Sequence, residues 1–230
     1  MLGVFFPIVL VTTVIFGALA VGLSLVDKRL GFHSGTMWAW LLTRTSFVRV
    51  RVRGRERMER GRSYVVLANH QGNFDILALY GYLGRPFRWV IKQELRKVPF
   101  LGWGCAAIGH IFVDRGDSRR ALASLEAAKP LLSGGVSVVF FPEGTRSADG
   151  RLARFKKGGF VMARQLDLEI VPVSISGSYA VLPKGCLFPR PGTIEVTIQP
   201  PIAPRDFSDD AALLDAARAA IAAGLAAAER

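Results

Sequence analysis

The two residues of this chain best suited to proton transfer are His70 and Asp75, which stand five positions apart. Gly72 lies between them and allows a tight turn, so the aspartate can fold back and accept a hydrogen bond from the imidazole. The second ring nitrogen of His70 is then left as a general base. No serine or cysteine is evident beside the pair as a nucleophile. We therefore expect the substrate to supply the hydroxyl group that is activated.

Three polar clusters follow apolar runs that have the length of buried strands. Residues 69–75 follow Tyr-Val-Val-Leu-Ala, residues 114–115 follow Ile-Phe-Val, and residues 142–147 follow Val-Ser-Val-Val-Phe-Phe. An ordinary polar loop would explain any one of them. In open α/β sheets, however, ligands bind beyond the carboxyl ends of the strands. Three such clusters together predict a site where a histidine, carboxylates and arginines converge.

The remaining histidines and the cysteines do not form a metal-binding pattern. His33 and His110 do not cluster with His70 in the sequence, and Cys105 and Cys186 form no Cys-x-x-Cys pair. We therefore predict no metal site, and we interpret both cysteines as reduced and structural.

The elements that must position these residues are those of an α/β fold. Short apolar runs alternate with helical stretches, which is typical of a largely parallel central sheet flanked by helices. The pattern predicts strands over residues 64–68, 88–91, 111–113, 136–141, 170–174 and 193–198. It predicts helices over residues 76–82, 118–132, 160–165 and 209–229, the last with Ser208 as its N-cap.

A further strand is predicted where valines and arginines alternate, over residues 47–53. The valines share one face and pack inward, while the arginines share the other. The arginine face has two interpretations, which the sequence leaves open. It is either a solvated face that discourages edge pairing or a surface that contacts anionic lipid headgroups.

The N-terminal segment belongs in or on a bilayer. Residues 2–26 contain no charged side chain, and as a helix they would extend about 37 Å, enough to cross the hydrocarbon core. A cleaved signal peptide is the rival interpretation, but no basic residue precedes the apolar run. Lys28 and Arg29 come just after it. The positive-inside tendency then predicts an inner (cytoplasmic) membrane location with the catalytic domain on the cytoplasmic side.

The same segment also permits a helical pair that dips into one leaflet without crossing, since it contains Pro7, Gly17 and Gly22 and is followed by an amphipathic stretch over residues 37–42. The sequence does not distinguish spanning from dipping. We predict an N-terminal membrane-associated helical segment over residues 1–45 and one α/β domain over residues 46–230.

The composition of the chain limits the classes of partner that it could bind. The chain has 230 residues, half of them hydrophobic, and a formal net charge of +12. Such a balance combines a sizeable core with an anionic partner, either nucleic acid or phospholipid headgroups. A tethered nucleic-acid-binding protein would not need His70 with Asp75, and no recognised binding module is present. We therefore expect a phospholipid bilayer and no nucleic acid.

Four ordered motifs carry a resemblance to a known family. They are the His-x-x-x-x-Asp block within residues 69–75, a second block at 109–115, Phe-Pro-Glu-Gly-Thr-Arg at 141–146 and a fourth block at 170–177. In order and spacing the chain resembles the glycerophospholipid acyltransferases, in particular the bacterial lysophosphatidic acid acyltransferases. The likeness extends over residues 60–180.

The resemblance implies a role for each matching residue. His70 would be the general base and Asp75 would orient its imidazole and stabilise the cation. The positions assigned to binding the acceptor's glycerol phosphate are Arg115, Glu143 and Arg146, with Gly144 and Thr145 shaping that loop. Lys156 is a further phosphate candidate, although a solvated lysine beside Lys157 is an equally ordinary interpretation.

The implied reaction moves a fatty acyl group from acyl-CoA or acyl-carrier protein to the sn-2 hydroxyl of lysophosphatidic acid and yields phosphatidic acid. A thiolate, with a thiol pKa near ~8.5, leaves without a strong general acid, so one base is sufficient. No bound cofactor is expected. Two alternatives stay open: another lysolipid acceptor, such as a lyso-ornithine lipid or lysophosphatidylglycerol, or hydrolysis of a lipid with water in place of the acceptor.

Overall fold

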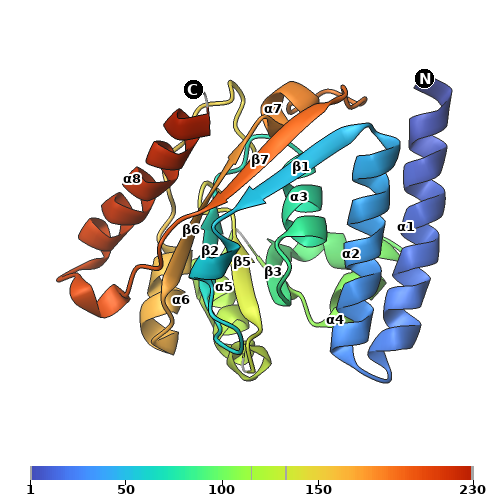
Figure 1. Ribbon diagram of the computed structural model, residues 1–230. Coiled ribbons are helices and arrows are strands. Elements are labelled where there is room, and N and C mark those ends of the chain that lie inside the picture. The colour runs from blue at the N-terminus through green and yellow to red at the C-terminus, as the bar shows by residue number, and fades with distance from the viewer. Residues whose placement is uncertain (1, 115, 133, 229–230) are drawn as a thin grey trace.

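A seven-stranded sheet in the order β1-β7-β6-β2-β5-β3-β4 forms the centre of the computed structural model, which describes residues 2–114, 116–132 and 134–228 (Figure 1). The strands are β1 Val48–Arg53, β2 Val65–Ala68, β3 Phe87–Lys92, β4 Ile111–Val113, β5 Ser137–Phe140, β6 Ile170–Ser176 and β7 Gly192–Ile198. All seven predicted strands are present, and no end differs from its predicted position by more than two residues.

The sheet is largely parallel, as predicted. β2 pairs in parallel with β5 and β6, and β3 pairs in parallel with β5 and β4. Among the described strands, only the β6–β7 pair is antiparallel. The carboxyl ends of β2, β3, β4, β5 and β6 therefore meet at one edge of the sheet. This is the edge where the polar clusters were expected to converge.

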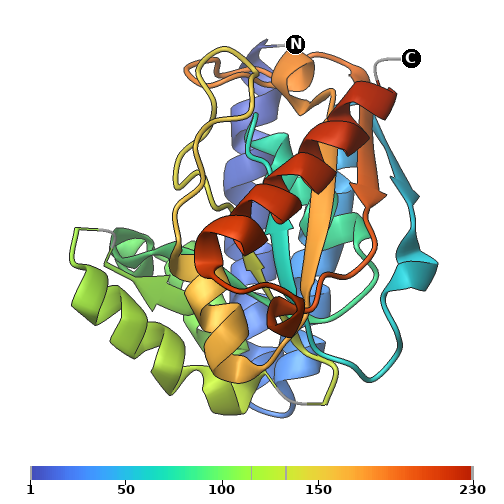
Figure 2. The same ribbon diagram turned by 90° about the vertical axis from the view of Figure 1, so that its left-hand side faces the viewer.

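Helices cover both faces of the sheet (Figures 1 and 2). One face carries α1 Leu2–Ser24, α2 Lys28–Thr45, α3 Phe74–Tyr82 and α4 Leu101–Ile108; the other carries α5 Ser118–Ala127, α6 Gly158–Leu166 and α8 Asp210–Ala228. Shorter elements are α7 Ser178–Val181 and the 3-10 turns η1 Arg55–Arg57, η2 Gln93–Lys97, η3 Lys129–Leu131 and η4 Pro204–Asp206.

Two helix predictions need correction. The helix predicted over residues 118–132 ends at Ala127, because Pro130 has no backbone N–H and disfavours helical backbone in the residue before it. The cap of α8 is Asp209 in place of Ser208. Its Oδ1 accepts hydrogen bonds from the backbone N–H groups of Ala211 and Ala212, at 2.8 and 2.9 Å.

The helix α4 was not predicted, because it contains two glycines, Gly102 and Gly104. Glycine lowers helix propensity, but here it permits close packing against α1. A Cβ added at Gly104 would lie 3.3 Å from Ala20 Cβ, and one added at Gly17 would lie 2.7 Å from the carbonyl oxygen of Phe100. Gly17 therefore serves helix packing and does not interrupt α1.

The helices α1 and α2 form an antiparallel hairpin beside the sheet (Figure 1). The buried face of α2 contributes Phe32, Ala39 and Leu42 to the core that also contains Tyr80 and Phe87. The boundary predicted at residue 45 remains a prediction, since the hairpin shares this core with the rest of the chain.

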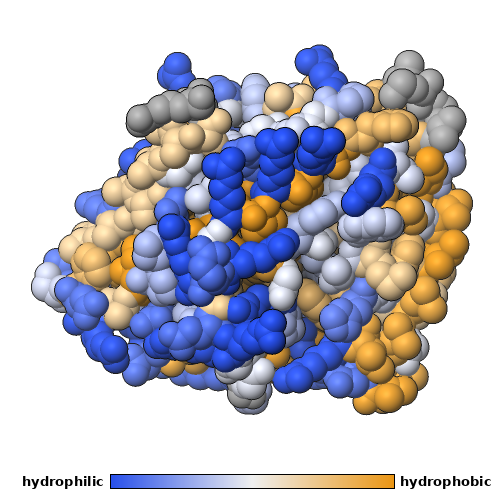
Figure 3. Space-filling model, viewed as in Figure 1, coloured by the Kyte–Doolittle hydropathy of each residue, from blue (hydrophilic) through white to orange (hydrophobic). Residues whose placement is uncertain are grey.

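The outer surface of α1 is apolar along its described length (Figure 3). Within the described residues two helices are long and apolar enough to cross a membrane, over Phe5–Ser24 and Asp210–Ala228. The second packs against β6 and buries Leu213, Ala217 and Ile221, so its apolar side covers the sheet. On α1 the exposed apolar side chains are Phe6, Leu10, Val11, Ile15, Leu19 and Leu23.

The alternating strand β1 points its valines into the core, as predicted. Its arginines form a hydrophilic row on the other face (Figure 3). Arg51 and Arg53 lie 3.6 and 3.8 Å from the carboxylate of Glu195 on β7. These pairs are partly exposed, so they add little stability. Contact of this face with lipid headgroups stays a prediction.

Candidate active site

The catalytic candidate His70 stands where β2 leaves the sheet, and the residue before it fixes that point. Asn69 is fully buried. Its Nδ2 donates to the carbonyl oxygen of Ile175 at 2.8 Å, and its Oδ1 accepts from the N–H of Ile175 at 2.7 Å. The amide side chain thus continues the β2–β6 hydrogen-bond ladder by one step. The backbone that carries His70 therefore begins from a rigid position.

The imidazole of His70 is hydrogen-bonded to Asp75, with 2.8 Å between Nδ1 and Oδ2. The same carboxylate oxygen accepts the backbone N–H groups of Gln71 and Gly72, at 2.7 and 2.8 Å. Asp75 is fully buried in the first turn of α3, where the helix dipole favours a negative charge. Because the carboxylate accepts from Nδ1–H, the lone pair of His70 lies on Nε2.

Aromatic stacking fixes the plane of the imidazole. The ring of Phe141 stacks on that of His70 at 3.9 Å and 10°, and the ring of Trp89 stacks on Phe141 at 5.3 Å. The side chain of His70 is 12% exposed. Within the described part of the chain, no serine or cysteine side chain is hydrogen-bonded to this imidazole. The arrangement in the described residues is a base and an orienting acid without a serine or cysteine nucleophile bonded to the base.

Gly72 lies in a turn, as predicted, where the N–H of Asp75 donates to its carbonyl oxygen at 3.3 Å, but close packing is a second reason for a glycine here. A Cβ at this position would lie 2.7 Å from the carbonyl oxygen of Ser178 and 2.8 Å from that of Leu182. Both are backbone atoms at α7, so they cannot move aside as a flexible side chain would. The absence of a side chain lets the His70 loop lie against α7.

Gly72→Ala is therefore expected to destabilise the fold by about 1–3 kcal/mol through overpacking. Denaturant unfolding in detergent measures the change. Gly22→Ala is the matched control, because a Cβ there meets nothing within 4 Å and the position is helical. Equal stability of the two variants would contradict the close-packing explanation.

The sequence Phe-Pro-Glu-Gly after β5 forms a β-turn that directs Glu143 inward. The N–H of Gly144 donates to the carbonyl oxygen of Phe141 at 3.0 Å, with Pro142 second in the turn and Gly144 fourth at φ +75°. Glu143 is 5% exposed. Its Oε1 accepts the N–H of His70 at 2.7 Å, and its Oε2 accepts the N–H of Ala153 at 2.9 Å. Burial raises the pKa of Glu143, and these two donors partly oppose the rise.

The other predicted binding residues lie toward solvent. Thr145 and Lys156 are exposed and Arg146 is half-buried. A Cβ on Gly144 would lie 3.0 Å from Lys156 Nζ, so the lysine amine lies over the turn. The cationic side chains of Arg146 and Lys156 thus lie nearer the solvent than the buried carboxylate of Asp75. Arg115 lies outside the described residues.

An apolar cavity of about 390 Å³ adjoins the site. Phe141 connects the two, since it stacks on His70 and also lines the cavity. The cavity extends between the sheet and the helices α5 and α6. Its apolar lining includes Val90, Val113, Ala121, Leu125, Phe140 and Val161, and its cations are Lys156 and Lys157.

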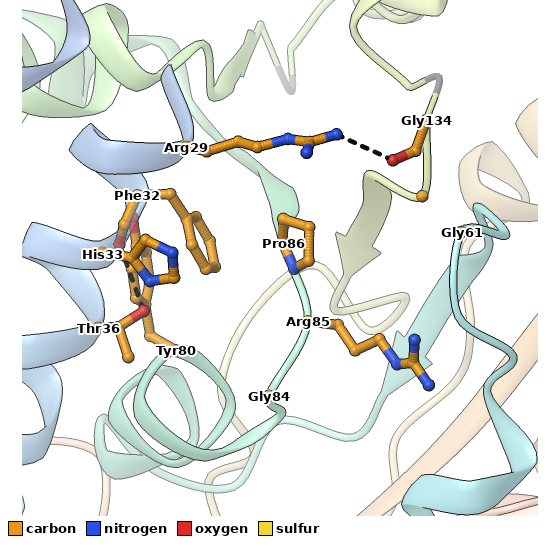
Figure 4. Close-up of a pocket in the computed structure, with 11 residues that line it drawn as sticks. Arg29, Phe32, His33, Thr36, Gly61, Tyr80, Gly84, Arg85, Pro86 and Gly134 are labelled. Carbon is orange, nitrogen blue, oxygen red and sulfur yellow. Dashed lines mark hydrogen bonds between the residues drawn. The ribbon is translucent and has the colours of Figure 1, made fainter. Parts of the chain in front are cut away.

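A second cavity, of about 380 Å³, opens near the amino ends of β2, β3 and β5 (Figure 4). Arg29 reaches across from α2 and donates to the carbonyl oxygen of Gly134 at 3.2 Å, which ties the hairpin to the loop before β5. His33 and Arg85 also line it. None of the predicted site residues does, so this cavity is separate from the His70 site.

The remaining titratable groups of interest are structural. His110 is buried, accepts the N–H of Trp89 on Nδ1 at 3.2 Å and donates from Nε2 to the Tyr80 hydroxyl at 3.0 Å. Burial lowers its pKa to about 3, and the charge of Arg88 acts in the same direction. Burial also raises the pKa of the Cys105 thiol to about 12, so it is a poor nucleophile at neutral pH. Both cysteines are free.

Sequence reasoning missed several residues that build the site. Phe141 was placed in a family motif and Trp89 in an apolar run, but neither was assigned a role at the site. Gln71, whose Nε2 donates to the carbonyl oxygen of Gly150 at 2.7 Å, also had no assigned role. No group of three or more histidines, cysteines or carboxylates suitable for a metal ion is found over residues 2–114, 116–132 and 134–228.

A histidine base, a buried orienting carboxylate and an adjoining apolar cavity at the carboxyl ends of a parallel sheet define an enzyme that activates a hydroxyl group or water. The chain belongs to the acyltransferase family: the family model described as Acyltransferase matches residues 49–176. This confirms the family resemblance and the enzyme class predicted from the motifs.

Named relatives agree with the family. A 1-acyl-sn-glycerol-3-phosphate acyltransferase of Chlamydomonas reinhardtii is 36% identical over 86% of this chain and 59% of its own length. One of Pseudomonas aeruginosa is 35% identical over 70% of this chain and 62% of its own length. The chain thus spans about three fifths of these relatives.

A solved structure confirms the fold. The 1-acyl-sn-glycerophosphate (LPA) acyltransferase PlsC from Thermotoga maritima superposes with a TM-score of 0.86 and 29% sequence identity, over 98% of this chain and 93% of that one. The similarity therefore includes the N-terminal hairpin as well as the sheet.

Proposed function

We propose that this chain is a 1-acyl-sn-glycerol-3-phosphate acyltransferase, which moves a fatty acyl group from an acyl thioester to the sn-2 hydroxyl of lysophosphatidic acid. The observation that carries the proposal is the hydrogen bond between His70 Nδ1 and Asp75 Oδ2, which leaves Nε2 as a base. Among the described residues no serine or cysteine side chain is hydrogen-bonded to this imidazole. The relatives' names supply the substrate.

The proposed step balances with this one base. His70 Nε2 takes the proton of the acceptor hydroxyl as its oxygen attacks the thioester carbonyl, and Asp75 stabilises the imidazolium. The tetrahedral intermediate collapses, the C–S bond breaks, and the thiolate leaves and takes up the proton. No resident cofactor takes part in this scheme. Acyl-CoA or acyl-carrier protein is the co-substrate that supplies the thioester.

We assign the adjoining apolar cavity to the acyl chain of the donor. Its lining is mostly aliphatic and it begins at Phe141, against the catalytic imidazole. An acyl chain placed there has its carbonyl end near His70. Lys157 lines the same cavity and would attract the phosphates of coenzyme A or an acidic carrier protein.

The acceptor phosphate is assigned to Arg115, Arg146 and Lys156. Arg146→Ala is expected to raise the KM for lysophosphatidic acid by a factor equivalent to about 1.5–3 kcal/mol, because a charge-assisted hydrogen bond to phosphate is lost. Steady-state kinetics with each substrate varied in turn measure this. Arg60→Ala, an exposed arginine before β2, is the control. An increase confined to the KM for the acyl donor would contradict the assignment.

We propose that the α1–α2 hairpin attaches the enzyme to the membrane by dipping into one leaflet. The inner side of α1 packs on α2 and α4, whereas its outer side and the turn residues Leu25 and Val26, 86% and 82% exposed, are apolar. Crossing the bilayer would require α1 to separate from these partners. A bilayer location gives the site access to lysophospholipid by lateral diffusion, and we place the catalytic domain on the cytoplasmic side of the inner membrane.

The test is transfer of a labelled acyl group from acyl-CoA, and separately from acyl-carrier protein, to lysophosphatidic acid in detergent micelles. Labelled phosphatidic acid supports the proposal. Product with lysophosphatidylglycerol or a lyso-ornithine lipid alone would redirect the acceptor assignment. Free fatty acid without an acylated acceptor would overturn transfer in favour of hydrolysis.

A further inference from the structure

Glu143 is in the wrong place to bind a phosphate. It is 5% exposed, and both of its carboxylate oxygens already accept backbone N–H groups, Oε1 from His70 and Oε2 from Ala153. A carboxylate directed at a phosphate would also repel it. The family motif places an acidic residue here, so its function must come from the groups that it actually contacts.

Those contacts connect the catalytic loop with the loop after β5. Besides the bonds of Glu143, the N–H of Ser147 donates to the carbonyl oxygen of His70 at 2.8 Å, and Gln71 donates to that of Gly150. The backbone of His70 is therefore held on both sides, by Glu143 at its N–H and by Ser147 at its carbonyl. Among the described residues, Glu143 is the only one whose side chain accepts both the backbone N–H of His70 and a backbone N–H of the loop after β5, that of Ala153.

We infer that Glu143 is a positioning residue of the acyl transfer, which fixes the backbone of His70 so that Nε2 meets the acceptor hydroxyl. This rests on the proposed function. Asp75 sets the rotation of the imidazole, and Glu143 sets the place from which the side chain extends. The orientation of a base determines the transfer rate, and a displacement of about 1 Å can lower it about 10²-fold.

Glu143→Gln separates positioning from substrate binding. The glutamine has the same shape but only one acceptor oxygen, so its NH₂ group must face the N–H of either His70 or Ala153. One hydrogen bond is lost and two donors are opposed. The expected result is a kcat lowered about 10²-fold with the KM for lysophosphatidic acid changed by less than about threefold.

Asp149→Asn is the matched control. Asp149 lies in the same loop and accepts the N–H of Arg151 and the hydroxyl of Ser147, but it has no bond to His70. Its variant is expected to keep the wild-type kcat. Glu143→Asp keeps the charge with a shorter reach, and its kcat is expected to lie between those of the wild type and Glu143→Gln.

An unchanged kcat with a KM for the acceptor raised tenfold or more would overturn the inference and make Glu143 a binding residue. If circular dichroism shows that Glu143→Gln is unfolded, kcat and the KM for the acceptor are measured on Glu143→Asp and interpreted in the same way. A wild type that transfers no acyl group to any lysolipid defeats the proposed function. In that case the nitrogen chemical shifts of His70 in wild type and Glu143→Gln still test the positioning. A shift of the His70 backbone amide and ring supports it, and identical spectra overturn it.

Discussion

His70→Ala is expected to lower kcat by about 10²–10⁴-fold, the usual contribution of a general base. The imidazole is hydrogen-bonded through Nδ1 to a buried carboxylate and is stacked on Phe141, so its Nε2 is free and held in a fixed orientation. Its removal leaves Asp75 with the N–H groups of Gln71 and Gly72, so the buried carboxylate remains hydrogen-bonded. The fold should therefore survive the substitution.

The measurement is labelled acyl transfer to lysophosphatidic acid, with circular dichroism on the same preparations. His33→Ala is the control, because this histidine is exposed on α2 and lines the cavity near the opposite edge of the sheet. It should transfer at the wild-type rate. A folded His70→Ala variant with near-normal transfer would refute the assigned base.

The fold was predictable because its signals are local. Apolar runs such as residues 65–68 and 137–140 carry polar residues at their ends, and parallel strands bring those ends to one edge. The hydrogen bond between His70 and Asp75 was also predictable from their spacing, since a turn and the first residues of a helix are enough to bring the two side chains together. The structure places both features as the sequence suggested.

The supporting contacts were not predictable, since each depends on a partner distant in the sequence. Asn69 bonds Ile175, 106 residues away, and Glu143 meets a donor at Ala153 only because the loop folds back. The motif shows an acid at position 143 but not what it accepts. Gly72 was read as a turn glycine, whereas the carbonyl groups of α7 decide that it must lack a side chain.

The N-terminal segment shows the same limit. Hydropathy measures the apolar length of residues 2–26 but not what covers one side of the helix. The glycines at 17 and 104 allow α1 and α4 to approach closely, and this packing is the basis of our proposal that the hairpin dips into one leaflet. The hydropathy of residues 2–26 alone does not predict the contact between α1 and α4.

Asp75→Asn is expected to lower kcat by about 10²–10⁴-fold and the free energy of unfolding by about 1–3 kcal/mol. The catalytic loss follows from charge, because a neutral amide stabilises an imidazolium less than a carboxylate does. The stability loss follows from hydrogen bonding. Asp75 Oδ1 is buried and has no hydrogen-bond partner among the described residues, so an NH₂ group in its place finds no acceptor.

The amide could also rotate, but that orientation is worse. Its NH₂ group would then face the N–H groups of Gln71 and Gly72, and it could only donate to His70 Nδ1, which would move the imidazole proton to Nε2 and remove the base. Both orientations therefore predict slow transfer, and the ring nitrogen shifts of His70 tell which is adopted. Asp149→Asn should leave both rate and stability near wild type. Retained kcat in Asp75→Asn, with Nδ1 still protonated, would show that the charge of Asp75 contributes nothing beyond orientation.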